Sequence, residues 1–173
     1  LTITGDNPVT VELGAAYTDA GATATDLDSA TVTSVSDVDT TLVGTYSVTY
    51  TATDPSGNSS TAVRTVDVED TTAPVFTSSA TFSAEENQTA IGTVTATDLQ
   101  SVTFEVSGSD LSITSAGVLS FVTEPDYETQ TVYTATVTAT DASSNSSTQD
   151  ITVNVTNDAV SYTHLTLPTI RSV

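Results

Sequence analysis

The side chains that could do chemistry in this chain are almost all carboxylates. The 173 residues include 22 Asp and Glu, only 2 Lys and Arg (Arg64 and Arg171), 1 His and no Cys, for a formal net charge of −20. The absence of Cys excludes disulfides and thiolate metal sites. Catalysis by a nucleophile–histidine pair would depend on His164 alone. Carboxylate groups remain, and these can bind a metal ion or take part in hydrolysis.

Hydrolysis would need a carboxylate pair such as Asp126 and Glu128, which lie two residues apart and would share one face of an extended strand. The chain has no Trp to form a sugar platform. It also has no phosphate-binding loop, dinucleotide fingerprint or Cys/His cluster. We therefore expect a protein that is not an enzyme.

The strong acidity argues against two classes of partner. Nucleic acids and anionic membrane surfaces are bound through Lys and Arg, which are nearly absent here. No run of about 18 apolar residues could insert into a membrane. A secreted protein in salty or calcium-containing surroundings fits the composition.

The chain carries the same phrase twice: residues 46–60 read YSVTYTATDPSGNSS and residues 133–147 read YTATVTATDASSNSS. Such a repeat indicates two homologous small domains in tandem. Apolar residues alternate with Ser and Thr in both copies, which is typical of half-buried antiparallel strands. Asp54 lies in a turn-like segment with Pro, Gly and Asn, so we expect it to form a turn. The predicted fold is all-β, with two tandem Greek-key β-sandwiches.

The predicted domains are a sandwich over residues 1–69, a linker over 70–73 and a sandwich over 74–158. The linker is short and lacks Gly and Ser, so we expect a stiff joint. The first module is expected to start before Leu1. Residues 159–173 change in character, and Val160–Thr169 resembles translated read-through of a sequencing adapter. We therefore expect a non-native tail that includes His164.

Arg64 occupies a position that should face inward, because it corresponds to Ile151 of the second repeat. We expect its stem to cover the edge of the core and its charged head to reach water. The acidic residues Asp6, Asp19, Asp26 and Asp28 are expected to be solvated in loops.

Ordered short motifs relate both modules to known families. Residues 74–158 resemble a bacterial cadherin-like repeat through Pro74-Val75-Phe76, Glu85-Glu86-Asn87, Gly92–Asp98, Gly117-Val118-Leu119, Pro125-Asp126-Tyr127-Glu128, Ala139-Thr140-Asp141 and Val153–Asp158. Residues 1–69 resemble a bacterial Ig-like domain related to hyalin repeats through Gly5-Asp6-Asn7-Pro8, Tyr17–Ala22 and Gly44-Thr45-Tyr46. Modules of these kinds occur in large surface proteins of bacteria.

The cadherin-like resemblance implies calcium ions between consecutive modules. It places Asp98 and Asp141 with Glu69 and Asp70 at the internal joint. It places a second ligand set at the C-terminal joint, formed by Glu86, Asp126, Glu128, Asn157 and Asp158. Carboxylate and amide oxygens are ligands that calcium prefers.

The chain departs from the cadherin-like pattern at the internal joint. Gln100 stands where the family has a second Asp, and the first module lacks an Asp-x-Glu partner. This joint is therefore expected to hold one calcium ion or none. The alternative is that these carboxylates only form turns or confer solubility.

The predicted function is that of structural or adhesive spacer repeats in a large secreted or cell-surface bacterial protein, with joints rigidified by calcium. The expected partners are neighbouring repeats of the same chain, with surface glycans or other cell-surface proteins as further candidates. A monomer is expected, because exposed edge strands rich in Thr and Asp disfavour pairing. The alternative is an accessory spacer or carbohydrate-binding module of a secreted polysaccharide-degrading enzyme.

Overall fold

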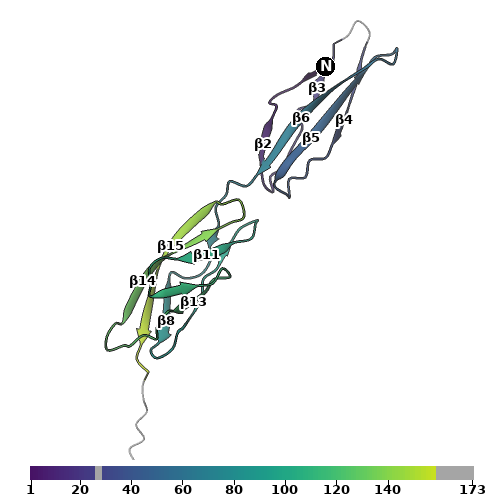
Figure 1. The fold of residues 1–173 in the computed structure, drawn as a ribbon. Coiled ribbons are helices and arrows are strands. Elements are labelled where there is room, and N and C mark those ends of the chain that lie inside the picture. The colour runs from purple at the N-terminus through teal and green to yellow at the C-terminus, as the bar shows by residue number, and fades with distance from the viewer. Residues whose placement is uncertain (26–28, 159–173) are drawn as a thin grey trace, which may run out of the picture. The chain divides into compact units, whose positions relative to one another are not determined.

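The computed structural model describes residues 1–25 and 29–158, and all of its regular elements are β-strands (Figure 1). The predicted all-β fold is confirmed. Asp26, Asp28, Arg171 and the proposed tail with His164 lie outside the described residues. The division at residues 70–73 stays a prediction.

The chain forms two compact units, which are described separately. The first comprises Leu1–Val75, Ala96–Thr103 and Ala139–Ser147. Among the described residues, the second comprises Phe76–Thr95, Phe104–Thr138 and 148–158.

The N-terminal strands form a four-stranded sheet of order β2-β6-β5-β4 and a two-stranded sheet β1-β3. The bounds are β1 Thr2–Ile3, β2 Val9–Glu12, β3 Ala22–Thr23, β4 Thr31–Ser36, β5 Gly44–Thr53 and β6 Ser59–Glu69. The central pair β5 and β6 is antiparallel, whereas β2 runs parallel to β6.

The alternation read from the sequence determines which side of β5 and β6 is buried. Val48, Tyr50 and Val66 are each 0–1% exposed, and the residues between them face outward. Full burial of one such side chain stabilises the fold by about 1.5–3 kcal/mol. The inward face of this sheet is therefore the core of the first unit.

Arg64 is part of this core, and the prediction that its charged head reaches water is wrong. The side chain is 2% exposed, and its Nε lies 3.2 Å from Asp19 Oδ1 and donates to Tyr50 Oη over 3.1 Å. Its terminal nitrogen donates to the carbonyls of Thr4 and Gly21. A charge can be buried when it is paired and hydrogen-bonded, and these groups supply both conditions.

Asp19 is likewise not the solvated loop residue expected from the sequence. Its carboxylate accepts hydrogen bonds from Tyr50 Oη at 2.5 Å, Tyr17 Oη at 3.0 Å and the Gly21 N–H at 3.0 Å. Burial raises the pKa of Asp19, but these hydrogen bonds and the Arg64 charge outweigh it and hold the pKa below its ordinary value. Burial and the bond to Asp19 raise the pKa of Tyr17 to about 12.

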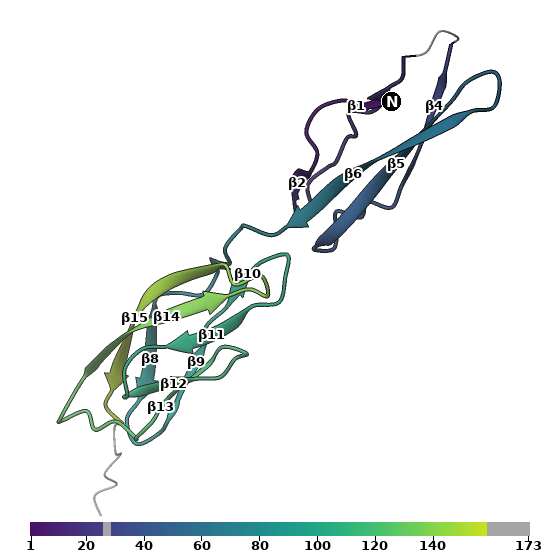
Figure 2. The ribbon, with the colours of Figure 1, turned by 45° about the horizontal axis from the view of Figure 1, so that its top comes forward.

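The second half of the chain forms sheets of order β11-β14-β15-β8, β12-β13-β9 and β10-β7 (Figure 2). The bounds are β7 Val75–Phe76, β8 Thr81–Glu85, β9 Ala90–Thr93, β10 Ala96–Thr97, β11 Thr103–Val106, β12 Leu111–Ile113, β13 Val118–Phe121, β14 Val132–Thr140 and β15 Ser146–Thr156. The inward residues of β14 and β15, including Val137, Ile151 and Val153, are 0–1% exposed. The strands predicted from the second repeat are therefore confirmed.

Removing one partner of the Arg64–Asp19 pair should destabilise the first unit strongly. We expect Asp19→Asn to lower the free energy of unfolding by about 3–5 kcal/mol, because the Arg64 charge would stay buried without its counter-charge. Urea denaturation measures this, with the exposed Asp6→Asn as the control. Because folding lowers the Asp19 pKa, its contribution is present above about pH 4 and is lost as the pH falls through the folded pKa. Equal stability of the two variants at pH 7 would contradict the assignment.

Candidate metal centre

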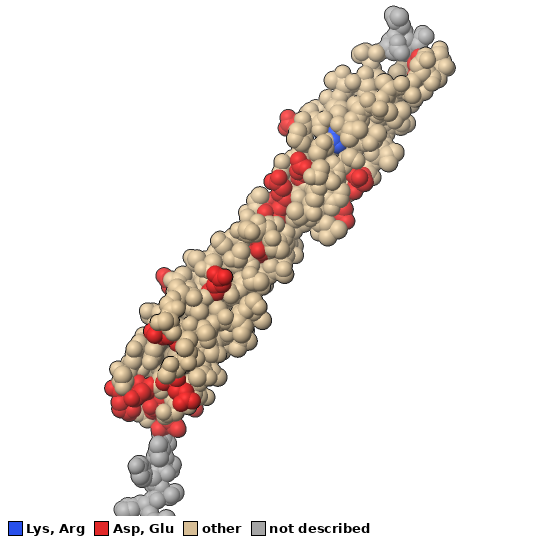
Figure 3. All heavy atoms as spheres, in the orientation of Figure 1, with Lys and Arg blue, Asp and Glu red and all other residues tan. Residues whose placement is uncertain are grey.

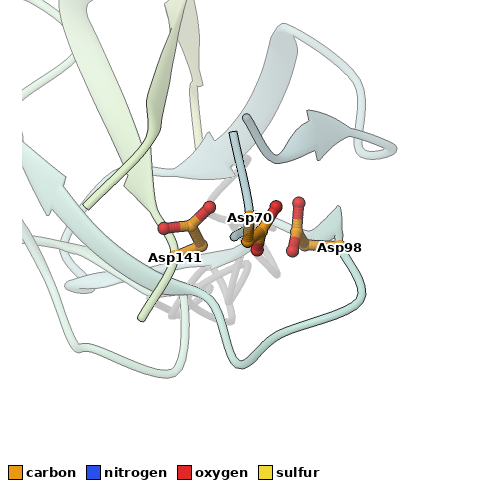
Figure 4. A group of neighbouring side chains, drawn as sticks. All are labelled: Asp70, Asp98 and Asp141. Atoms are coloured by element: carbon orange, nitrogen blue, oxygen red, sulfur yellow. The ribbon is translucent and has the colours of Figure 1, made fainter. Parts of the chain in front are cut away.

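Three Asp side chains converge where three strands end (Figure 4). Asp70 follows β6, Asp98 follows β10 and Asp141 follows β14. Each offers a carboxylate oxygen, and the three oxygens lie within 4.8 Å of one another. The structure thus brings together three of the four residues predicted for the internal joint, here called the Asp70 cluster.

Asp70 is the least satisfied member of the Asp70 cluster. Its side chain is 7% exposed, and Oδ1 accepts a hydrogen bond of 3.2 Å from the Thr72 N–H. Oδ2 is buried and has no hydrogen-bond partner among the described residues. Burial raises the pKa of Asp70 above its ordinary value, and the charges of Asp98 and Asp141 raise it further. The carboxylate therefore lacks a compensating positive group in the place where a cation would supply one.

Asp141 is held by a loop that also holds the backbone of Asp70. The Asn145 N–H donates to Asp141 Oδ1 and the Asn145 Nδ2 to Asp141 Oδ2, both at 2.8 Å. The same Nδ2 donates to the Asp70 carbonyl at 2.8 Å. Each Asp141 oxygen uses one acceptor site in this way and keeps another for a ligand.

The first repeat forms the same loop around Asp54. The Asn58 N–H and Nδ2 donate to the two Asp54 oxygens at 2.8 and 2.7 Å. This agrees with the predicted turn-forming role of Asp54. Asp54 and Asn58 therefore provide a matched reference for Asp141 and Asn145.

Asp98 is oriented by the residue that departs from the family pattern. The Gln100 N–H donates to Asp98 Oδ1 at 2.8 Å, and Gln100 Nε2 donates to Ser143 Oγ at 2.9 Å. Gln100 Oε1 is buried and has no partner among the described residues. A neutral amide at this position leaves the cluster with three carboxylates instead of four.

Glu69 does not join the cluster, whereas the unpredicted Glu12 contacts the same segment. Glu69 is exposed, and its carbonyl accepts from the Leu13 N–H at 2.7 Å. The Glu12 carboxylate accepts from the Thr71 N–H at 3.0 Å and from the hydroxyls of Thr71 and Thr72 at 2.8 Å. The Thr71 and Thr72 bonds lower the Glu12 pKa, and the resulting negative charge contributes to raising that of Asp70.

A second carboxylate group, here called the Glu86 cluster, consists of Glu86, Asp126 and Glu128, whose ligand oxygens also lie within 4.8 Å of one another. Figure 3 shows acidic side chains gathered at the end of the second unit where β15 ends. Glu86 is partly buried, and the other two are exposed. A hydrogen bond from the Thr129 hydroxyl is the main cause that lowers the Asp126 pKa.

Asn157 and Asp158, the two other residues predicted for this site, contact the Glu86 cluster through N–H groups that donate hydrogen bonds. The Asp158 backbone N–H donates to Glu86 Oε1 at 3.0 Å, and Asn157 Nδ2 donates to Glu128 Oε1 at 3.1 Å. Only three of the five predicted residues therefore present carboxylate oxygens to one another.

Neither cluster has a basic partner within the described part of the chain. Arg64 is the single basic side chain described, and it is paired with Asp19. Each cluster is a set of hard oxygen donors, the set that suits calcium, which takes 6–8 oxygens including bidentate carboxylates, carbonyls and water. The unpartnered Asp70 Oδ2 fits such an ion in the first cluster.

Residues 1–68 match a family model described as bacterial surface protein, Ig-like domain. The bacterial Ig-like domain predicted there is confirmed. This match indicates a structural or adhesive repeat with an extracellular or surface location. A search of curated proteins found no match. The described residues contain no helix long and apolar enough for a membrane span.

Cadherin ectodomains are among the solved structures that are similar to this chain. Chicken VE-cadherin EC1-2 is 17% identical, with 88% of this chain and 98% of that chain covered and a TM-score of 0.46. Drosophila N-cadherin EC1-4 is 25% identical, with coverage of 65% and 32% and a TM-score of 0.45. The protocadherin GammaB4 extracellular domain is 23% identical, with coverage of 65% and 21% and a TM-score of 0.45. The chain thus spans about a fifth of that protocadherin and a third of the N-cadherin fragment.

Neutralising Asp70 should stabilise the metal-free protein. Folding raises the Asp70 pKa, so at a pH above that pKa the ionised carboxylate lowers the free energy of unfolding. This loss disappears below about pH 4, where the carboxyl is protonated in both the folded and the unfolded state. We expect Asp70→Asn in EDTA at pH 7 to raise the melting temperature, by about 2–4 °C for each kcal/mol relieved. Thermal unfolding measures this, with the exposed Glu105→Gln as the control. A lower melting temperature for Asp70→Asn would contradict the prediction.

Proposed function

We propose that the chain supplies spacer repeats of structural or adhesive type to a secreted or cell-surface bacterial protein, and that calcium stiffens these repeats. The observation that carries the calcium site is the buried, unpartnered Oδ2 of Asp70 beside Asp98 and Asp141. The Ig-like family match over residues 1–68 supports the surface location.

The electrostatics of the Asp70 cluster favour a divalent cation. Two unit charges about 4–5 Å apart repel by about 3–4 kcal/mol at an effective dielectric constant of about 20. Three carboxylates make three such pairs, and the chain has few cations to oppose them. A bound calcium ion replaces this repulsion with attraction and gives Asp70 Oδ2 a partner.

The same ion would limit motion of the segment that follows β6. Asn145 Nδ2 already binds the Asp70 carbonyl at 2.8 Å, and Ser147 Oγ donates to the Pro74 carbonyl at 2.5 Å. These two bonds hold the ends of residues 70–74. Calcium bound by Asp70, Asp98 and Asp141 together would also tie the Asp70 side chain to the residues that follow β10 and β14. This restriction of motion is the stiffening that a spacer needs.

The Glu86 cluster is proposed as a second, weaker calcium site. Its carboxylates are more exposed than those of the first cluster, and solvent screens them. Asn157 and Asp158 hold Glu128 and Glu86 through N–H donors and thus position the carboxylates. A site of this kind has affinity on the order of 10⁻⁴–10⁻³ M, the range of extracellular modules.

Calcium should raise the melting temperature through the Asp70 cluster. At 100 times the dissociation constant the ion adds about 2.7 kcal/mol, which corresponds to about 5–10 °C. Thermal unfolding in EDTA, calcium and magnesium measures the shift. Asp141→Asn should abolish it, whereas Asp54→Asn, which changes the same loop in the first repeat, should retain it. Loss of the shift in both variants, or no shift in the parent protein, would remove calcium from this site.

Terbium, a luminescent substitute for calcium, should report separately on the Glu86 cluster. The Tyr127 N–H donates to Glu86 Oε2 at 3.2 Å, so this tyrosine lies next to the cluster. We expect tyrosine-sensitised terbium emission to fall strongly in Glu86→Gln and Tyr127→Phe, and to persist in Glu105→Gln. Emission that is unaffected by Glu86→Gln would contradict the second site.

A further inference from the structure

Strand β4 leaves one side without a hydrogen-bonding strand. It is the last strand in the order β2-β6-β5-β4, and none of the described strands pairs with its outer side (Figure 1). The strand runs over six residues, Thr31–Ser36, with the sequence TVTSVS. It contains no charge, Pro or Gly, and it pairs with β5 without a shift in register. An edge of this kind is a template for pairing with another strand.

The other edge strands of the three- and four-stranded sheets carry features that oppose such pairing. Strand β2 contains Glu12, β8 ends at Glu85 and β11 contains Glu105. Strand β12 has only three residues, and β9 contains Gly92 and a register irregularity against β13. Charge, shortness and irregularity are the usual protections of an edge. Strand β4 has none of them.

The outward face beside β4 consists of uncharged rows that cross the sheet. One row is Val35, Thr49 and Val63, and the next is Thr33, Thr51 and Thr61. Val35 is 76% exposed and Val63 is 51% exposed. A strand added beside β4 would place a side chain next to Val35 and extend this row, because cross-strand neighbours on one face contact each other.

We propose that β4 pairs antiparallel with β4 of a second copy of this chain, which joins two four-stranded sheets into one. A second copy offers an edge with the same alternation of Thr and Val. With Ser34 opposite Ser34 across a two-fold axis, Thr33 of one copy lies opposite Val35 of the other. Both residues then stay on the outward face, as the pleat requires.

Charge favours this edge as the place of contact between copies. Each chain carries a net charge of −20, so copies repel one another over most of their surface. Contact through the uncharged Thr31–Ser36 brings no pair of carboxylates directly opposite each other. Such an edge offers no charge to select a basic partner. The expectation of a monomer relied on Asp in the edge strands, and β4 contains none.

The contact between two β4 strands involves only six residues of each copy, so we expect a weak association. Cross-linking is a suitable measurement because it traps dimers that form only transiently. The chain has no Cys, so a single Ser34→Cys, at the residue that faces itself across the two-fold axis, reports only on pairs of β4 strands. Its control is Ser83→Cys, at an exposed position of the edge strand β8. Under mild oxidation, Ser34→Cys should form disulfide-linked dimers at least about tenfold faster, the ratio that about 1.4 kcal/mol of contact free energy gives. Higher salt should increase the rate, because it screens the repulsion between the chains.

Two further substitutions in the Ser34→Cys background separate edge pairing from packing of the outward faces. Val35→Glu, at the edge, should reduce the rate to that of the Ser83→Cys control. Val63→Glu, on the same face but inside the sheet, should leave the rate unchanged. Both side chains are largely exposed, and circular dichroism checks that the variants fold. Equal rates for Ser34→Cys and Ser83→Cys would overturn the proposal, as would a loss of dimers in Val63→Glu alone. Equal rates combined with protection of the Ser34→Cys thiol by an added lysine-rich β-strand peptide would instead indicate a basic partner and would also overturn it. None of these outcomes depends on calcium.

Discussion

Repulsion between carboxylates is the constraint on which the rest of the structure depends. The chain has 22 acidic and 2 basic residues, and the one basic residue in the described part is committed to Asp19 in a buried network. The chain therefore has no described side chain with which to neutralise the Asp70 or Glu86 clusters. Any neutralisation must come from solution, and a divalent cation is the species whose chemistry fits these oxygens.

The position of the first cluster follows from where the strands end. Apolar alternation sets the length of β6 and β14, and an Asp is the first residue beyond each of them, as it is beyond β10. The ends of these strands bring the three carboxylates together, and Asn145 fixes the backbone of Asp70 to the Asp141 loop. The first repeat has an equivalent loop at Asp54 and Asn58, in which Asn58 holds the Asp54 carboxylate in the same way.

Local patterns predicted much of the fold and part of the candidate site. Period-2 alternation identified β5, β14 and β15 and their buried sides, because each strand is long and one of its faces is fully buried. The resemblance to cadherin-like repeats named Asp70, Asp98 and Asp141, which the structure brings together. It also named Glu69, but the last residue of β6 points its side chain to solvent while its carbonyl binds Leu13.

Long-range pairing explains what the sequence could not predict. The burial of Arg64 requires Asp19, Thr4 and Gly21, which are more than 40 residues away in the chain and are brought together only by the fold. The contact of Glu12 with Thr71 and Thr72 depends on the parallel pairing of β2 with β6, and no local pattern signals this pairing. Which edge strand lacks protection is likewise known only once the strand order is known.

The most direct test of the central claim is a crystal structure of the protein grown with calcium, with anomalous diffraction to identify the ion. The account predicts a calcium peak about 2.3–2.6 Å from carboxylate oxygens of Asp70, Asp98 and Asp141, with Asp70 Oδ2 among its ligands. A structure at saturating calcium with no ion there, and with Asp70 Oδ2 bonded to a protein donor or a lone water, would contradict it.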